Sequence, residues 1–97
     1  MNGLIIEDCD NVAIVIEAVK KQEIIRYRLK NGNVEEITAL EDIPVYHKIA
    51  TRLIHKGEKI IKYGEHIGEA AREIQTGEHV HVHNVISVRE NLENKPI

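Results

Sequence analysis

The chain has 97 residues, 42% of them hydrophobic, and a formal net charge of −3, which suffices for one domain and leaves no room for a second core. The negative charge and the absence of Phe and Trp argue against nucleic-acid binding, which needs a basic stripe and stacking aromatic rings. The single cysteine excludes an intrachain disulfide. Because there is no leader-like segment and no apolar run of ~18 residues, we expect a cytoplasmic protein that does not cross a membrane.

The first predicted elements are strands. The aliphatic residues are mainly Ile and Val, whose β-branched side chains favour a pleated surface. Residues 12–16 form a continuous apolar run and predict a strand that is buried on both faces. Two further runs, 23–29 and 34–40, flank Asn31-Gly32. This pair predicts a hairpin over residues 23–40 closed by a type I′ turn.

Beyond residue 41, short apolar pieces alternate with turns. Residues 54–60 and 74–80 share one pattern: Ile, two residues, Gly-Glu, one residue, and a β-branched apolar residue. Residues 43–49 keep the outer apolar positions and lack Gly-Glu. This repeat indicates a turn that leads into a strand and is used several times. Residues 68–74 are the best helical candidate, so we expect a mostly β domain over residues 1–90 with one or two short helical turns, followed by a polar tail over 91–97.

A histidine tract closes the last repeat. His79, His81 and His83 alternate with Val80 and Val82. On a straight strand, the three imidazoles share one face and the valines occupy the other, buried face. Two histidines at positions i and i+2 can converge on one divalent metal ion, which leaves a different task for the third. The alternative is a solvated strand face that is rich in histidine and has no further function.

Residues 77–84, Gly-Glu-His-Val-His-Val-His-Asn, resemble the GEHVHVHN motif of the altronate/galactarate dehydratase family. Other stretches fit in the same order: residues 10–13 resemble the opening strand, 42–44 with 47–50 resemble "DIP…HKIA", and 56–58, 61–64 and 67–68 resemble "KGE…IKYG…IG". The resemblance covers roughly residues 10–88. It is to the small N-terminal SAF-type domain of these enzymes, which implies a β-clip fold. Related lyases such as sulfolactate sulfo-lyase carry this domain as a separate small subunit.

The resemblance implies an elimination reaction, the loss of water or sulfite from a hydroxylated acid, assisted by a divalent metal such as iron or manganese. It assigns His79 and His81 to the metal, and His79, His81 and His83 to catalysis. Asn84 would orient neighbouring groups or contact a substrate hydroxyl. The remaining substrate-binding candidates are Lys48 and Lys62 for a carboxylate, with Tyr63 and His47 as secondary contacts. Tyr46 stands where the family often has a glycine, so this loop is expected to differ in shape.

The leading hypothesis is therefore a small subunit or N-terminal domain of a metal-dependent hydro-lyase that acts on a sugar acid. Ligand pockets need roughly 300–1,000 Å³, so the chain is expected to be inactive without a large catalytic partner; whether it also self-associates stays open. The first alternative is a stand-alone SAF-type binding module for a small acid or a protein partner. The second alternative is a metal carrier that uses the histidine strand.

Overall fold

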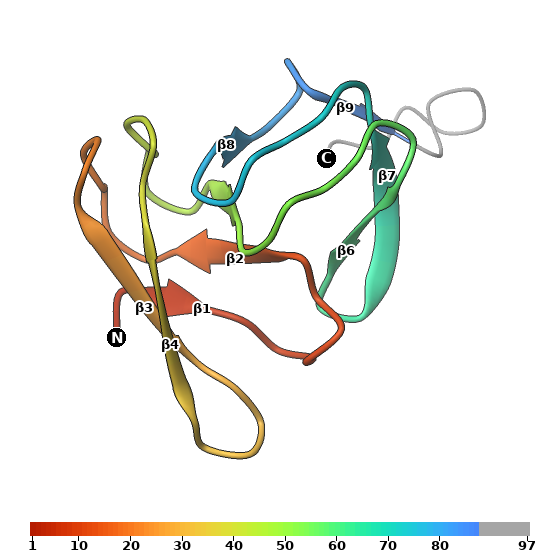
Figure 1. The fold of residues 1–97 in the computed structure, drawn as a ribbon. Coiled ribbons are helices and arrows are strands. Elements are labelled where there is room, and N and C mark those ends of the chain that lie inside the picture. The colour runs from red at the N-terminus through yellow and green to blue at the C-terminus, as the bar shows by residue number, and fades with distance from the viewer. Residues whose placement is uncertain (88–97) are drawn as a thin grey trace.

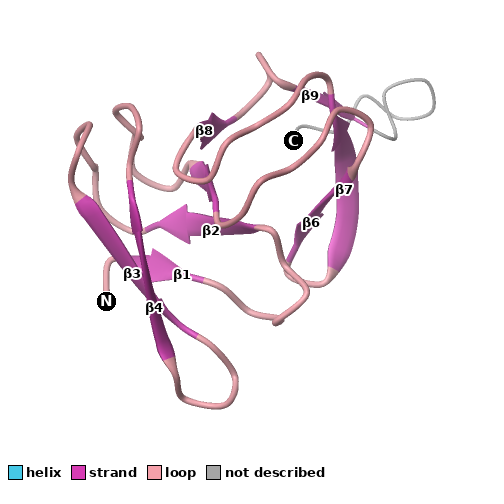
Figure 2. Cartoon of the chain, in the orientation of Figure 1, coloured by secondary structure: helices cyan, strands magenta, loops and turns pink. Residues whose placement is uncertain are grey.

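The computed structural model describes residues 1–87, which form nine strands and no helix (Figures 1 and 2). The predicted polar tail, residues 91–97, lies outside the described residues. The mostly β fold is confirmed. The strands are β1 (Gly3–Leu4), β2 (Val12–Val15), β3 (Ile24–Arg28), β4 (Val34–Thr38), β5 (Lys48–Ala50), β6 (Lys59–Lys62), β7 (Glu65–Ala70), β8 (His79–Val80) and β9 (Val85–Ser87).

The strands form three antiparallel sheets. A central sheet has the order β1-β2-β5-β8, and β3-β4 and β6-β7-β9 form the other two. Figure 1 shows the β3-β4 hairpin at one side of the central strands and β6-β7-β9 at the other. The central strand β2 is buried along its whole length, as predicted. Its residues pack into two separate hydrophobic cores. Ala13 and Val15 belong to the first core, and Val12 belongs to the second.

Two local predictions were wrong. The hairpin over residues 23–40 is confirmed, but its turn is not type I′, because only Gly32, and not Asn31, has a positive φ. The N–H of Gly32 donates to Leu29 O and the N–H of Leu29 to Asn33 O, as in a hairpin whose glycine forms a bulge. The predicted helix at residues 68–74 is instead the end of β7 followed by a bend, because pairing with β6 and β9 overrides the helical propensity. Within residues 1–87 no helix is long and apolar enough to span a bilayer.

The repeated turn is confirmed and has one more copy than the sequence pattern indicated. Its buried apolar residues meet in pairs as isolated β-bridges, Val19 with Ile43 and Ile54 with Ile74. A four-residue turn follows each of these residues. In every turn, the N–H of the last residue donates a hydrogen bond to the carbonyl of the first. The turns are residues 20–23, 44–47, 55–58 and 75–78. The third residue has a positive φ in every one (Gln22, Tyr46, Gly57 and Gly77), as a type II turn requires.

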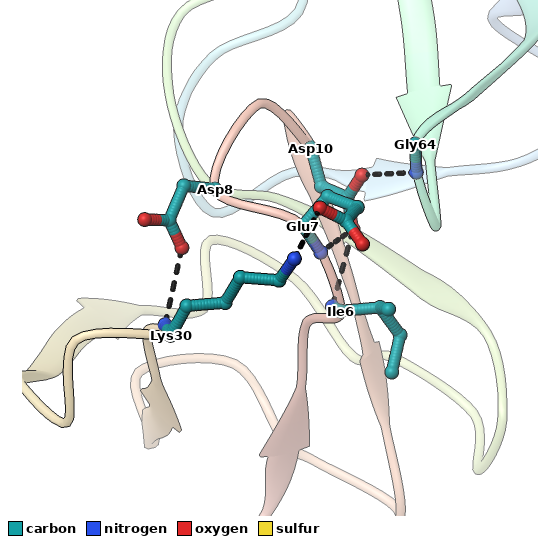
Figure 3. A network of polar contacts seen from close by, with 6 residues as sticks. All are labelled: Ile6, Glu7, Asp8, Asp10, Lys30 and Gly64. Atoms are coloured by element: carbon teal, nitrogen blue, oxygen red, sulfur yellow. Dashed lines mark hydrogen bonds and ion pairs between the residues drawn. The ribbon is translucent and has the colours of Figure 1, made fainter.

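A buried carboxylate holds the loop between β1 and β2. Asp10 is 2% exposed, and its Oδ2 accepts hydrogen bonds from the N–H groups of Ile6 (3.2 Å) and Glu7 (3.1 Å). Its Oδ1 accepts one from the N–H of Gly64 (2.7 Å) in the turn between β6 and β7. Figure 3 shows this carboxylate lying between the two segments. Asp10 therefore ties the N-terminal loop to the third sheet.

The substitution Asp10→Ala is expected to lower the free energy of unfolding by about 2–4 kcal/mol, because it removes a buried carboxylate and with it three part-buried hydrogen bonds to N–H groups. Asp8 is the matched control: it is exposed and accepts one hydrogen bond, from the N–H of Lys30. Asp8→Ala is expected to cost less than about 1 kcal/mol. Urea denaturation of both variants measures the difference, and equal losses would contradict the role of Asp10.

Candidate functional site

The candidate site lies where β5 and β8 run side by side. Their register pairs Lys48 with Val80 and Ile49 with His79. Continued by one residue, this register places His47 opposite His81. Since side chains alternate between the faces of a strand, His47, His79 and His81 emerge on one face of this pair.

The imidazole rings are in contact. His47 Nδ1 lies 2.8 Å from His79 Nε2, a hydrogen-bond distance. The ring centroid of His47 is 4.5 Å from that of His81, and the His79 and His81 rings stack at 5.4 Å with an interplanar angle of 9°. The ring centroid of His83 is 5.4 Å from that of His79. We call His47, His79 and His81 the histidine cluster, with His83 at its edge.

The straight histidine strand predicted from the sequence was wrong. β8 ends at Val80, and residues 81–84 form a turn in which the N–H of Asn84 donates to His81 O (3.1 Å). Val80 is buried as predicted, but Val82 is 65% exposed because it lies in this turn. Even so, His79 and His81 remain neighbours, and a third histidine, His47 from the turn that precedes β5, joins them.

Asn84 holds the turn together. It is fully buried; its Oδ1 accepts a hydrogen bond from the N–H of His81 (3.0 Å), and its Nδ2 donates to His79 O (2.9 Å). Both functional groups of the side chain therefore bind the backbone of cluster residues. This is the arrangement of a residue that orients its neighbours.

Burial and mutual proximity favour the neutral forms of His79 and His81. Burial, then the charges of His47, His83 and His81, lower the pKa of His79 to about 4, although the charge of Glu41 raises it. Burial is also the largest cause that lowers the pKa of His81. A neutral imidazole has a free nitrogen lone pair and can bind a metal ion or accept a proton.

Acidification of the metal-free protein from pH 6.5 towards pH 4 is expected to reduce its stability. His79 has a pKa of about 4 in the folded chain and an ordinary value of 6.5. Between these values the unfolded state binds a proton that the folded state does not, so stability present above pH 6.5 is lost as the pH falls. Urea midpoints at pH 7 and pH 5 should differ less for His79→Gln than for the wild type. His66→Gln, which replaces an exposed histidine of β7, should keep the wild-type difference.

Of the predicted lysines, Lys48 lies on the other face of the β5–β8 pair, and Lys62 ends β6 in the third sheet. Lys48 is 4% exposed and leaves β5 on the side of Val80, opposite to His47. Burial, then the charge of Lys62, lower its pKa to about 8, and its own charge contributes to the lowered pKa of His81. The Nζ of Lys62 lies 5.3 Å from the ring centroid of Tyr63. Lys62 is thus in contact with Tyr63, its charge acts on Lys48, and the charge of Lys48 acts on His81.

Glu41 is a site residue that sequence reasoning missed. Its Oε2 accepts a hydrogen bond from the backbone N–H of His79 (3.0 Å), and its charge acts on the His79 ring. In the sequence, Glu41 and Asp42 resemble a solvated acidic pair. The contact joins residues 38 positions apart, and no local pattern signals it.

The histidine cluster fits a metal ion. One nitrogen from each of its three rings lies within 4.8 Å of the others, which is near the spacing of roughly 3–3.5 Å between ligand nitrogens around an ion at ~2.0–2.1 Å. His81 Nδ1 is buried and has no hydrogen-bond partner. A buried polar atom in this state costs free energy unless a ligand satisfies it. Imidazole donors suit divalent iron and zinc ions.

Comparison with known proteins identifies the origin of these motifs. Residues 1–88 match the family described as the altronate/galactarate dehydratase SAF domain. The chain is 41% identical over 75 residues to the altronate dehydratase of Bacillus subtilis (strain 168), which covers 77% of this chain and 14% of that enzyme. The chain therefore spans about one seventh of that relative's length.

Two shorter relatives are subunits. The (2R)-sulfolactate sulfo-lyase subunit alpha of Chromohalobacter salexigens is 32% identical over 88 residues, covering 88% of this chain and 94% of that subunit. The subunit alpha of the same name from Paracoccus pantotrophus is 44% identical over 48 residues, covering 50% of this chain and 72% of that subunit. The likeness therefore extends over nearly the whole of a small subunit and over a small part of a large enzyme.

Proposed function

The chain belongs to the altronate/galactarate dehydratase SAF domain family, and from this premise we propose that it is the small component of a metal-dependent lyase acting on a sugar acid. The observation that carries the proposal is the histidine cluster, in which three ring nitrogens converge and one buried nitrogen lacks a partner. His47, with His79 and His81, would hold a divalent ion, iron or manganese. Such an ion polarises a hydroxyl or carboxylate of the substrate.

The other residues of the site suit a hydroxylated acid. The charge of Lys62 contributes to the lowered pKa of Lys48, and in the described part of the chain neither lysine forms an ion pair with a carboxylate. They would bind the carboxylate of the substrate. His83, beside His79, would accept or deliver a proton, because an imidazole side chain serves as general base or general acid. Tyr63 would border the acid through its contact with Lys62.

A large partner would supply the rest of the active site. The relatives named subunit alpha match this chain over most of their length, and the name implies at least one further subunit in those enzymes. In the Bacillus altronate dehydratase, the matching segment is a small part of a much longer chain. We therefore infer that this chain contributes the histidine and lysine groups to an active site that a large catalytic component completes.

Reconstitution tests this proposal. The chain alone, and the chain combined with a candidate large subunit, are assayed with altronate, galactarate and (2R)-sulfolactate in the presence of Fe²⁺ or Mn²⁺. We expect turnover of one of these acids only by the combination, and loss of turnover with His79→Ala but not with His66→Ala. Robust turnover by the chain alone would contradict the need for a partner. Acid binding by the chain alone, with no turnover in any combination, would instead identify a stand-alone binding module.

A further inference from the structure

The turn that carries His47 is one of four equivalent turns. Hydrogen bonds around the first and third turns match: the N–H of Gln22 and of Gly57 donate to the carbonyls of Ala39 and Ala70, respectively. Those around the second and fourth also match. At the second turn, the N–H of Val15 donates to His47 O. At the fourth turn, the N–H of Ala50 donates to Glu78 O. His47 is therefore the structural counterpart of Glu78.

In three of these turns, the side chain of the last residue caps the N–H of the first residue. The carboxylate of Glu23 accepts the N–H of Lys20 (2.6 Å), the first residue of its turn. Glu58 does the same for His55 (2.7 Å), and Glu78 for Gln75 (2.6 Å). The turns at 7–10 and 81–84 repeat the arrangement with Asp10 and Asn84. The last position of such a turn is thus normally occupied in capping the first N–H.

The turn at residues 44–47 keeps the backbone geometry without the cap. The N–H of His47 donates to Pro44 O (3.1 Å), and Tyr46 has a φ of 67°, as in the other copies. Its first residue is a proline, which has no N–H to cap. Its last residue is a histidine, whose ring turns instead to His79 (2.8 Å). Both differences from the other turns, proline at the first position and histidine at the last, occur in the one turn that contributes a residue to the histidine cluster.

We propose that Pro44 is a positioning residue for the site: by removing the N–H that position 47 would otherwise cap, it leaves the His47 ring free to join His79 and His81. The inference rests on the proposed function for its metal readout only. The hydrogen bond between His47 and His79 exists in the metal-free chain and gives a second readout.

The test compares Pro44→Ala, His47→Glu and the double variant. Alanine at position 44 restores the N–H, which should draw the His47 ring away from His79. We expect Mn²⁺ affinity to fall about 10-fold or more, as when the support of a metal ligand is lost. In the imidazole ¹H–¹⁵N spectrum, the signal of the hydrogen bond between His47 and His79 should disappear. In the double variant, the introduced carboxylate should cap the restored N–H, so its Tm should exceed that of His47→Glu by at least about 4 °C.

Lys20→Pro is the matched control, because it places a proline at the first position of an equivalent turn that contains no histidine. It should lower the Tm by removing a capped N–H, and it should leave Mn²⁺ affinity unchanged. If wild-type protein binds no metal, the proposed function fails, while the spectra and the Tm comparison still decide the role of Pro44. Unchanged His47 resonances in Pro44→Ala, or a double variant no more stable than His47→Glu, would overturn the inference.

Discussion

Replacing His81 by alanine is expected to reduce the affinity of the chain for Mn²⁺ or Fe²⁺ by about 100-fold or more while leaving its stability equal or higher. The affinity falls because one of three converging imidazoles is lost, and loss of mere supporting contacts already costs about 10–100-fold. The stability holds because His81 Nδ1 is a buried atom without a partner, so its removal takes away an unfavourable group. Anaerobic titration calorimetry and urea denaturation measure the two effects.

His66→Ala is the control for this prediction, since His66 is an exposed histidine of β7 and lies outside the cluster. It should change neither the affinity nor the stability. Metal affinity that survives in His81→Ala and also in His79→Ala would show that the cluster is not the metal site. A large loss of stability in His81→Ala would show instead that the ring serves mainly in packing.

Replacing Lys48 by methionine is expected to stabilise the fold by about 1–3 kcal/mol at pH 7 and to abolish turnover by the reconstituted enzyme. Lys48 is 4% exposed, and within residues 1–87 no carboxylate forms an ion pair with it, so its charge is buried without compensation. An apolar side chain of similar length removes that cost. Loss of turnover follows if the ammonium group binds the carboxylate of the substrate.

The dependence of stability on pH separates this effect from simple repacking. Lys48 has a pKa of about 8 in the folded chain and an ordinary value of 10.5. Between these values the unfolded state binds the additional proton, so the contribution of Lys48 makes the wild type more stable as the pH rises from 8 to 10.5. The wild-type and Lys48→Met stabilities should therefore converge over this range. Lys59→Met, at an exposed position of β6, should show no such convergence, and a constant difference for Lys48→Met would contradict the prediction.

The two substitutions share a physical basis. Lys48 and the Nδ1 of His81 are features that weaken the fold, and both lie at the candidate site. Unfavourable features that gather at one place are typical of a site whose residues serve function at the expense of stability.

The sequence by itself determined the fold class, the buried strand β2, the hairpin and the repeated turn. These features depend on local properties: the alternation of apolar residues, the turn residues and the β-branched side chains. The motif at residues 77–84 was long enough to identify the family. The first copy of the turn was missed because Gln22 replaces the glycine, although Val19, Glu23 and Ile25 occupy the positions that the pattern requires.

Only the tertiary structure decided how the site is assembled. The pairing of β5 with β8 places His47 opposite His81 and sends Lys48 to the other face, and strand register between distant segments is not encoded in either segment alone. Pairing with β6 and β9 likewise converted the expected helix into the end of β7. The sequence could therefore predict that these histidines and lysines are site residues, but long-range backbone pairing determined which of them share a face.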